Sequence, residues 1–175
     1  MELPGETFLF NLSLLGITFS AVSALVTLLR QAMGGKLSNF DVYLLTVYVS
    51  DGFVLAINAL LPVLFAQSGL SLPWVLTTAS GLAAAIIAGQ LAGILKMRKV
   101  ATKLKMSRGL KVNFTLNWLV VALLLANAAV PAIRSVFVFE AALTIFLATE
   151  MWIFVRRITT LLGDRPGHDW DLNRS

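Results

Sequence analysis

Apolar residues fill five long runs along the chain, and polar or charged residues collect between them. The runs cover residues 7–29, 42–65, 73–95, 114–133 and 136–158. Each run has about the 20 predominantly apolar residues that an α-helix needs to cross the hydrocarbon core of a bilayer. The pattern therefore predicts an all-α integral membrane protein, with a five-span domain over residues 1–160 and a polar tail over residues 161–175.

Composition supports the same interpretation. Hydrophobic residues make up 58% of the 175 residues and charged residues only 13%, and the mean hydropathy is +0.83. Soluble domains carry about 25% charged residues. A soluble core of this size could not bury so much apolar surface, so the excess is expected to face lipid.

The basic residues lie almost entirely at one side of the predicted helices. Thirteen of the 14 Lys and Arg residues fall in the first connection, the third connection or the C-terminal region, and Arg134 alone falls on the other side. Because Lys and Arg are enriched in cytoplasmic loops, this asymmetry predicts an N-terminus outside and a C-terminus in the cytoplasm. The membrane expected is the plasma membrane of a bacterium, that is, the inner membrane.

A basic segment without any acid follows the third run. Its residues are Lys96, Arg98, Lys99, Lys103, Lys105, Arg108 and Lys111. Apolar and basic residues alternate at helical spacing, which predicts an amphipathic cytoplasmic extension that binds anionic lipid or a membrane-protein partner. Ordinary positive-inside topology explains part of the same charge. Nucleic acid is not expected, since no aromatic residues are interleaved to stack on bases.

The third run carries small residues at every fourth position. This small-residue stripe consists of Gly81, Ala85, Gly89 and Gly93. Small residues let membrane helices approach closely where lipid provides no hydrophobic drive for association. The stripe is predicted to face protein, and a homo-oligomer is the expected assembly.

The second run contains Asp51, the most informative residue of the chain. It lies about 13 Å from the predicted cytoplasmic end at 1.5 Å per residue, close to mid-membrane. Tyr48 and Asn58 share its helix face. An intramembrane carboxyl group is a functional candidate by default. The alternative is a protonated Asp51 that only bonds to Tyr48 or to a hydroxyl group of a neighbouring helix.

Glu150 in the fifth run is predicted to lie at a depth comparable to that of Asp51. It shares a helix face with Arg157, seven residues further on, so a Glu150–Arg157 ion pair is the structural alternative to a functional role. Gln90 in the third run is polar enough to bond across to another helix. Two intramembrane acids with nearby amides and a phenol are typical of a cation or proton path.

Two of the runs that lead outward end in an Asn followed four residues later by Pro, as Asn58–Pro62 and Asn127–Pro131. Each Pro lacks the N–H that the carbonyl of the Asn would accept in a helix. Such a carbonyl is tolerated in a membrane only where side chains, water or another helix provide a partner.

Enzymatic chemistry finds little support. The chain has no Cys, its one His lies in the polar tail, and no Gly-rich phosphate loop is present. Thiolate nucleophiles, Ser–His pairs and thiolate metal sites are therefore excluded. No enzyme activity, cofactor or metal site is expected.

Two hypotheses of different classes remain. The first is a small homo-oligomeric channel or carrier for a cation or proton, with Asp51, Glu150, Asn58, Tyr48 and Gln90 on the path. The second is a non-transporting scaffold or accessory subunit, which binds anionic lipid or partner helices through the basic segment and the stripe. They differ in whether the two acids have to exchange protons or ions with water.

The charge asymmetry makes a direct prediction about topology. A reporter fused after Ser175 that is active only in the cytoplasm should be active, and one that is active only outside should be silent. The reverse result would invert the whole topology, because an odd number of spans links the two ends.

Overall fold

A computed structural model describes residues 3–32, 39–101 and 108–163, and in these ranges the chain forms five α-helices. They are α1 (Glu6–Ala32), α2 (Asn39–Gln67), α3 (Leu72–Ala101), α4 (Arg108–Ala129) and α5 (Val136–Gly163). All five are long and apolar enough to cross a membrane. The predicted all-α, multi-pass architecture is thereby confirmed.

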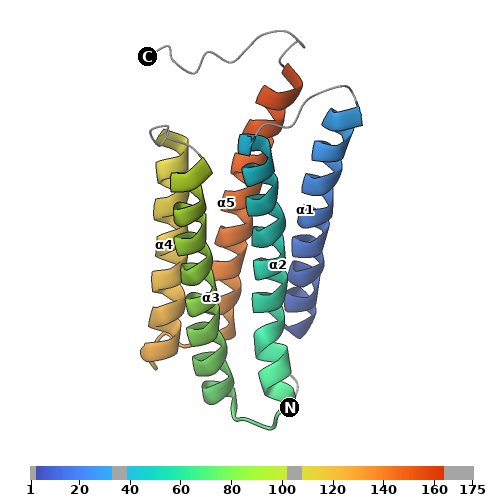
Figure 1. The fold of residues 1–175 in the computed structure, drawn as a ribbon. Coiled ribbons are helices and arrows are strands. Elements are labelled where there is room, and N and C mark those ends of the chain that lie inside the picture. Colours follow the sequence, from blue (N-terminus) through green and yellow to red (C-terminus); the bar gives the residue numbers. More distant parts are fainter. Residues whose placement is uncertain (1–2, 33–38, 102–107, 164–175) are drawn as a thin grey trace.

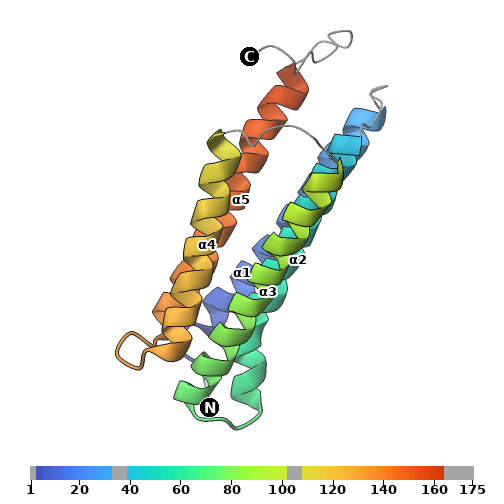
Figure 2. The ribbon, with the colours of Figure 1, turned by 60° about the vertical axis from the view of Figure 1, so that its left-hand side comes forward.

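The helices form two groups that run along the same axis (Figures 1 and 2). α1 packs along α2, which packs along α3, and α4 packs along α5. Viewed from the side in Figure 2, α1, α2 and α3 lie on one side of the bundle and α4 and α5 on the other. We call these the three-helix layer and the two-helix layer. They meet where α3 packs on α4 and where α5 packs on α2 and α1.

α4 differs from its predicted boundaries at both ends. It begins at Arg108, six residues before the predicted start at 114, and it ends at Ala129, four residues before the predicted end at 133. The early end has a clear cause, since Pro131 cannot donate to the carbonyl of Asn127. The Arg134 guanidinium fills in, with its Nε 3.4 Å from the Asn127 oxygen and its Nη2 donating to the Ala128 oxygen at 2.8 Å.

The basic segment is described in part. α3 continues past the predicted end at 95 to Ala101, so Lys96 and Arg98 lie on its last turns, and Arg108 and Lys111 lie on the first turns of α4. Lys96, Arg108 and Lys111 are exposed. Lys103, Lys105 and the side chain of Lys99 lie outside the described residues, as does the polar tail from residue 164.

α1 and α2 approach each other at two glycines. A Cβ atom on Gly16 would lie 2.6 Å from the Gly52 carbonyl oxygen, and one on Gly52 would collide with the Ser20 hydroxyl. The Ser20 hydroxyl also donates to the Val49 carbonyl at 2.9 Å. Glycine is needed at both positions because the two backbones approach too closely for any side chain.

The small-residue stripe has a different environment. Nothing lies within 4 Å of a Cβ atom built on Gly81, Gly89 or Gly93, and Ala85, Gly89 and Gly93 are exposed. The described part of the chain therefore does not cover the stripe. Its predicted contact with protein stays a prediction.

These two glycine environments predict opposite effects of a bulky side chain. Gly16→Leu should lower the free energy of unfolding by about 1–3 kcal/mol or more, because it overpacks a contact between backbones. Gly89→Leu should leave the stability of the single chain unchanged, which makes it the matched control. Unfolding by denaturant in detergent micelles measures both. Equal stability of the two variants would contradict the α1–α2 contact.

Candidate functional site

Asp51 of α2 and Glu150 of α5 meet inside the bundle. Their side chains are hydrogen-bonded to each other, and the two residues are only 3% and 5% exposed. Helices of the two layers therefore bring together the acids that the sequence places at comparable depth. We call Asp51 and Glu150 the acid pair.

α4 supplies two amide donors to Glu150. Asn113 donates from Nδ2 to Glu150 Oε1 at 3.0 Å, and Asn117 donates from Nδ2 to the same oxygen at 2.7 Å. Asn117 Nδ2 also lies 3.2 Å from Asn113 Oδ1. The two asparagines are one helical turn apart, so they share the face of α4 that packs on α5.

α3 supplies one amide donor to the other acid. Gln90 donates from Nε2 to Asp51 Oδ1 at 3.2 Å. Four helices thus contribute to one polar cluster, formed by Asp51, Gln90, Asn113, Asn117 and Glu150. The predicted pairing of Glu150 with Arg157 is not needed to satisfy Glu150, and the Arg157 side chain lies outside the described residues.

The hydrogen bond within the acid pair has a chemical requirement. A carboxylate has no proton to donate, so two carboxyl groups can bond only when one of them is protonated. Glu150 Oε1 accepts two amide N–H groups and Asp51 accepts one, which favours Glu150 as the carboxylate and Asp51 as the proton donor. The pair is therefore arranged to hold a single shared proton.

The same donor set is a poor match for a metal ion. Gln90, Asn113 and Asn117 each turn N–H groups toward the acids, whereas hard cations require oxygen ligands. Within the described ranges no group of three or more His, Cys, Asp or Glu residues could hold a metal.

Tyr48 lies one turn from Asp51 toward the end of the bundle where α4 begins. Its ring centroid is 6.1 Å from that of Phe19 and 5.2 Å from that of Phe154, and the Phe19 and Phe154 centroids are 5.2 Å apart. All three contacts are edge-to-face. The rings form a buried aromatic cluster of α1, α2 and α5 beside the acid pair.

Asn58 lies two turns from Asp51 in the opposite direction. It is 0% exposed, and neither its Nδ2 nor its Oδ1 has a hydrogen-bond partner. The Asn127 side chain, in contrast, donates to the Ser80 hydroxyl at 2.8 Å and accepts from the Ser135 N–H at 2.9 Å. Three of the predicted path residues therefore belong to the polar cluster, namely Asp51, Glu150 and Gln90. The other two, Tyr48 and Asn58, flank it.

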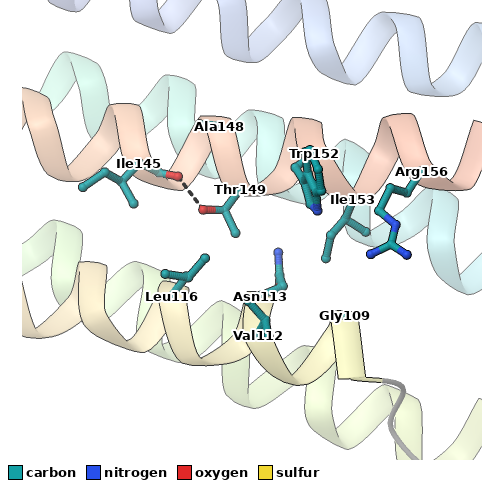
Figure 3. Close-up of a pocket in the computed structure, with 10 residues that line it drawn as sticks. All are labelled: Gly109, Val112, Asn113, Leu116, Ile145, Ala148, Thr149, Trp152, Ile153 and Arg156. Carbon is teal, nitrogen blue, oxygen red and sulfur yellow. Dashed lines mark hydrogen bonds between the residues drawn. The ribbon is translucent and has the colours of Figure 1, made fainter.

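A groove of about 450 Å³ opens between α4 and α5 beside the cluster (Figure 3). Most of its lining is apolar, with Val112 and Leu116 on α4 and Ile145 and Trp152 on α5. Asn113 lines the groove and extends from α4 toward α5. One amide thus separates this groove from Glu150.

Sequence reasoning did not assign Asn113 and Asn117 to the site. With a predicted helix start at 114, both residues belonged to the interface with water, where Asn is common. Because α4 begins at Arg108, they lie inside the helix. Their spacing of four residues places both amides on one face of a helix, where they can reach the acid Glu150 of the next run. This spacing is the signal that could have identified them.

Comparison of the chain with protein-family models, with curated proteins and with solved structures gives no match in any of the three.

The bonds to Glu150 predict a specific loss of stability. Asn117→Leu removes the donor at 2.7 Å, and the free energy of unfolding should fall by about 1–3 kcal/mol, the usual cost of leaving a buried partner unsatisfied. Thr115→Val is the matched control, because the exposed Thr115 hydroxyl bonds only to its own helix at Lys111. Equal stability of the two variants in detergent would mean that the amide does not bond to Glu150.

Proposed function

We propose that this protein is a small homo-oligomeric carrier of protons in a bacterial inner membrane, with the acid pair as the proton-binding site. The observation that supports this most strongly is the hydrogen bond between Asp51 and Glu150, two buried acids from different layers. Intramembrane acids are costly, and in membrane proteins they commonly mark proton relays and ion pathways.

The chemistry of the cluster favours a proton over a larger cation. Three amide N–H groups point at the carboxyl oxygens. These donors stabilise a carboxylate that has shared or lost its proton, but they repel a metal cation at the same oxygens. A proton needs no further ligands, because the two acids hold it between them.

Burial of the pair favours a carrier over an open pore. The acid pair joins the three-helix layer to the two-helix layer, so release of the shared proton would leave two carboxylates in contact. Their repulsion would act directly between the layers. A small displacement of one layer against the other is the movement expected to accompany proton exchange.

The outer surface of the bundle fits the proposed assembly. The stripe on α3 is uncovered within the described chain, and it offers a second copy a surface for close helix contact. Lys96, Arg108 and Lys111 are exposed at one end of the bundle. In the proposed orientation this end faces the cytoplasm and its anionic lipids.

A non-transporting accessory subunit is the second candidate. The observation in its favour is that both acids already have amide partners. In this second function the cluster has a structural role alone and holds four helices together. The stripe and the basic residues then bind a partner.

Proton flux distinguishes the two functions. Asp51→Asn keeps the size and hydrogen-bonding ability of the side chain but removes the titratable proton. The variant protein should fold and assemble normally. Proteoliposomes that contain it should lose at least about 90% of the wild-type proton flux, since removal of the relay group abolishes a step and does not merely slow it. A pH-sensitive dye inside the vesicles reports the flux.

Glu6→Gln is the matched control, because it removes an acid at the start of α1, away from the cluster, and it should retain wild-type flux. Wild-type flux in both Asp51→Asn and Glu150→Gln would exclude the carrier. A wild-type protein without flux under any applied gradient would favour the accessory subunit.

A further inference from the structure

Asn58 is a fully buried polar residue whose side chain has no partner. Its Nδ2 and Oδ1 both lack a hydrogen bond, and its exposure is 0%. Buried side-chain amides in folded proteins almost always bond to protein or to ordered water. Inside a membrane an unpaired amide is especially unfavourable, because no bulk water can reach it.

The main chain at Asn58 adds a third polar group. Pro62 lies inside α2, and it has no N–H to donate to the Asn58 carbonyl four residues earlier. One residue thus presents an amide donor, an amide acceptor and a main-chain acceptor at the same place. A buried water typically makes two to four hydrogen bonds to such groups.

The helix register places Asn58 between two polar layers of the bundle. Seven residues separate it from Asp51, so it lies on the same face of α2 and about 10.5 Å further along the helix. The same step along the neighbouring antiparallel helices leads from Glu150 to Leu143 and from Gln90 to Ala83, both fully buried. At this level α3 and α5 thus present apolar residues.

The next polar layer follows within one further turn. Ser80 and Asn127 are bonded to each other, and each lies ten residues, or about 15 Å, beyond the polar cluster along its own helix. Asn58 therefore lies between the acid pair and the end of the bundle where Asn127 bonds to Ser135. In the proposed topology this end faces outside.

The acid pair has different neighbours on its two sides. The aromatic cluster of Phe19, Tyr48 and Phe154 lies on the other side of the pair. Asn117, within the polar cluster, has an unpaired Oδ1. Unpaired polar atoms thus occur at the cluster and at Asn58, which are the two ends that a short water chain would require.

We propose that Asn58 is a buried water-binding site, and that the proton of the acid pair exchanges with the outer side by way of this water. The water site is inferred from the unpaired polar groups of Asn58 alone. The exchange route rests on the proposed function, since it requires a proton shared by Asp51 and Glu150.

The water site is tested first in the wild-type protein. With ¹⁵N-labelled asparagine in lipid bilayers, solid-state NMR measures magnetisation transfer from water to each side-chain amide. The Asn58 amide, assigned by its loss in Asn58→Leu, should receive strong transfer at short mixing times. Asn127 is the matched control, because it is also 0% exposed but has both ends bonded within the protein. Transfer to Asn58 no stronger than that to Asn127 would overturn the water site.

The route is tested by infrared spectroscopy after transfer of the protein into D₂O. The C=O band of the protonated carboxyl group should be present in wild type and absent in Asp51→Asn. Asn58→Leu should keep this band but slow its shift from hydrogen to deuterium by about tenfold or more, equivalent to about 1.4 kcal/mol in the barrier. Asn58→Ser, which retains a hydroxyl group for water, should exchange nearly as fast as wild type.

The remaining outcomes separate the two proposals. An unchanged exchange rate in Asn58→Leu would overturn the route. A slower exchange of the carboxyl band in Tyr48→Phe would also overturn it, because this substitution changes the opposite side of the acid pair. Absence of the carboxyl band in wild type would refute the shared proton and with it the proposed function, while the NMR result would still decide the water site. If Asn58→Leu fails to fold, Asn58→Ser and the wild-type transfer remain as tests.

Discussion

The hydrogen bond between Asp51 and Glu150 is the interaction on which the rest of the structure depends. An acidic side chain at the centre of a membrane helix costs about 2.5–3.5 kcal/mol on insertion scales, and this chain buries two such side chains in its interior. The cost is offset only if the two acids find hydrogen-bond donors and share a proton. Gln90, Asn113 and Asn117 supply the donors, so the positions of α3 and α4 follow from the requirements of α2 and α5.

Hydropathy was sufficient to predict five membrane helices, because lipid forces every span to be long, apolar and helical. Equal depth was enough to single out Asp51 and Glu150 as candidates for one site. The partners were harder to predict. Asn113 and Asn117 resemble interface residues until the start of α4 is known, and helix ends depend on capping interactions that hydropathy does not detect. Likewise, the regular stripe on α3 led to the prediction of close helix packing there. The close backbone contact in the structure involves Gly16 and Gly52, which no periodic pattern marks.

Each layer has its own internal connections. Gly16 and Gly52 hold α1 and α2 at backbone contact, and Arg134 binds the last carbonyls of α4 next to the turn into α5. Between the layers, the acid pair, the Ser80–Asn127 hydrogen bond and the edge-to-face contact of Tyr48 with Phe154 join the helices. Movement of one layer against the other would therefore have to rearrange these contacts together, since packed helices shift between discrete arrangements.

The location of the two acids also has a consequence for biosynthesis. Chains are made from the N-terminus, so α2 enters the membrane while the helix that carries Glu150 has not yet been translated. Until then Asp51 lacks the carboxyl group of Glu150, and α2 has to be retained in the membrane by its apolar residues. Its many Leu, Val and Ile residues each favour insertion by about 0.3–0.6 kcal/mol. The final arrangement of the bundle therefore has to wait for its last helix, and a ribosome that stalls before Glu150 would leave an inserted but unfinished membrane protein.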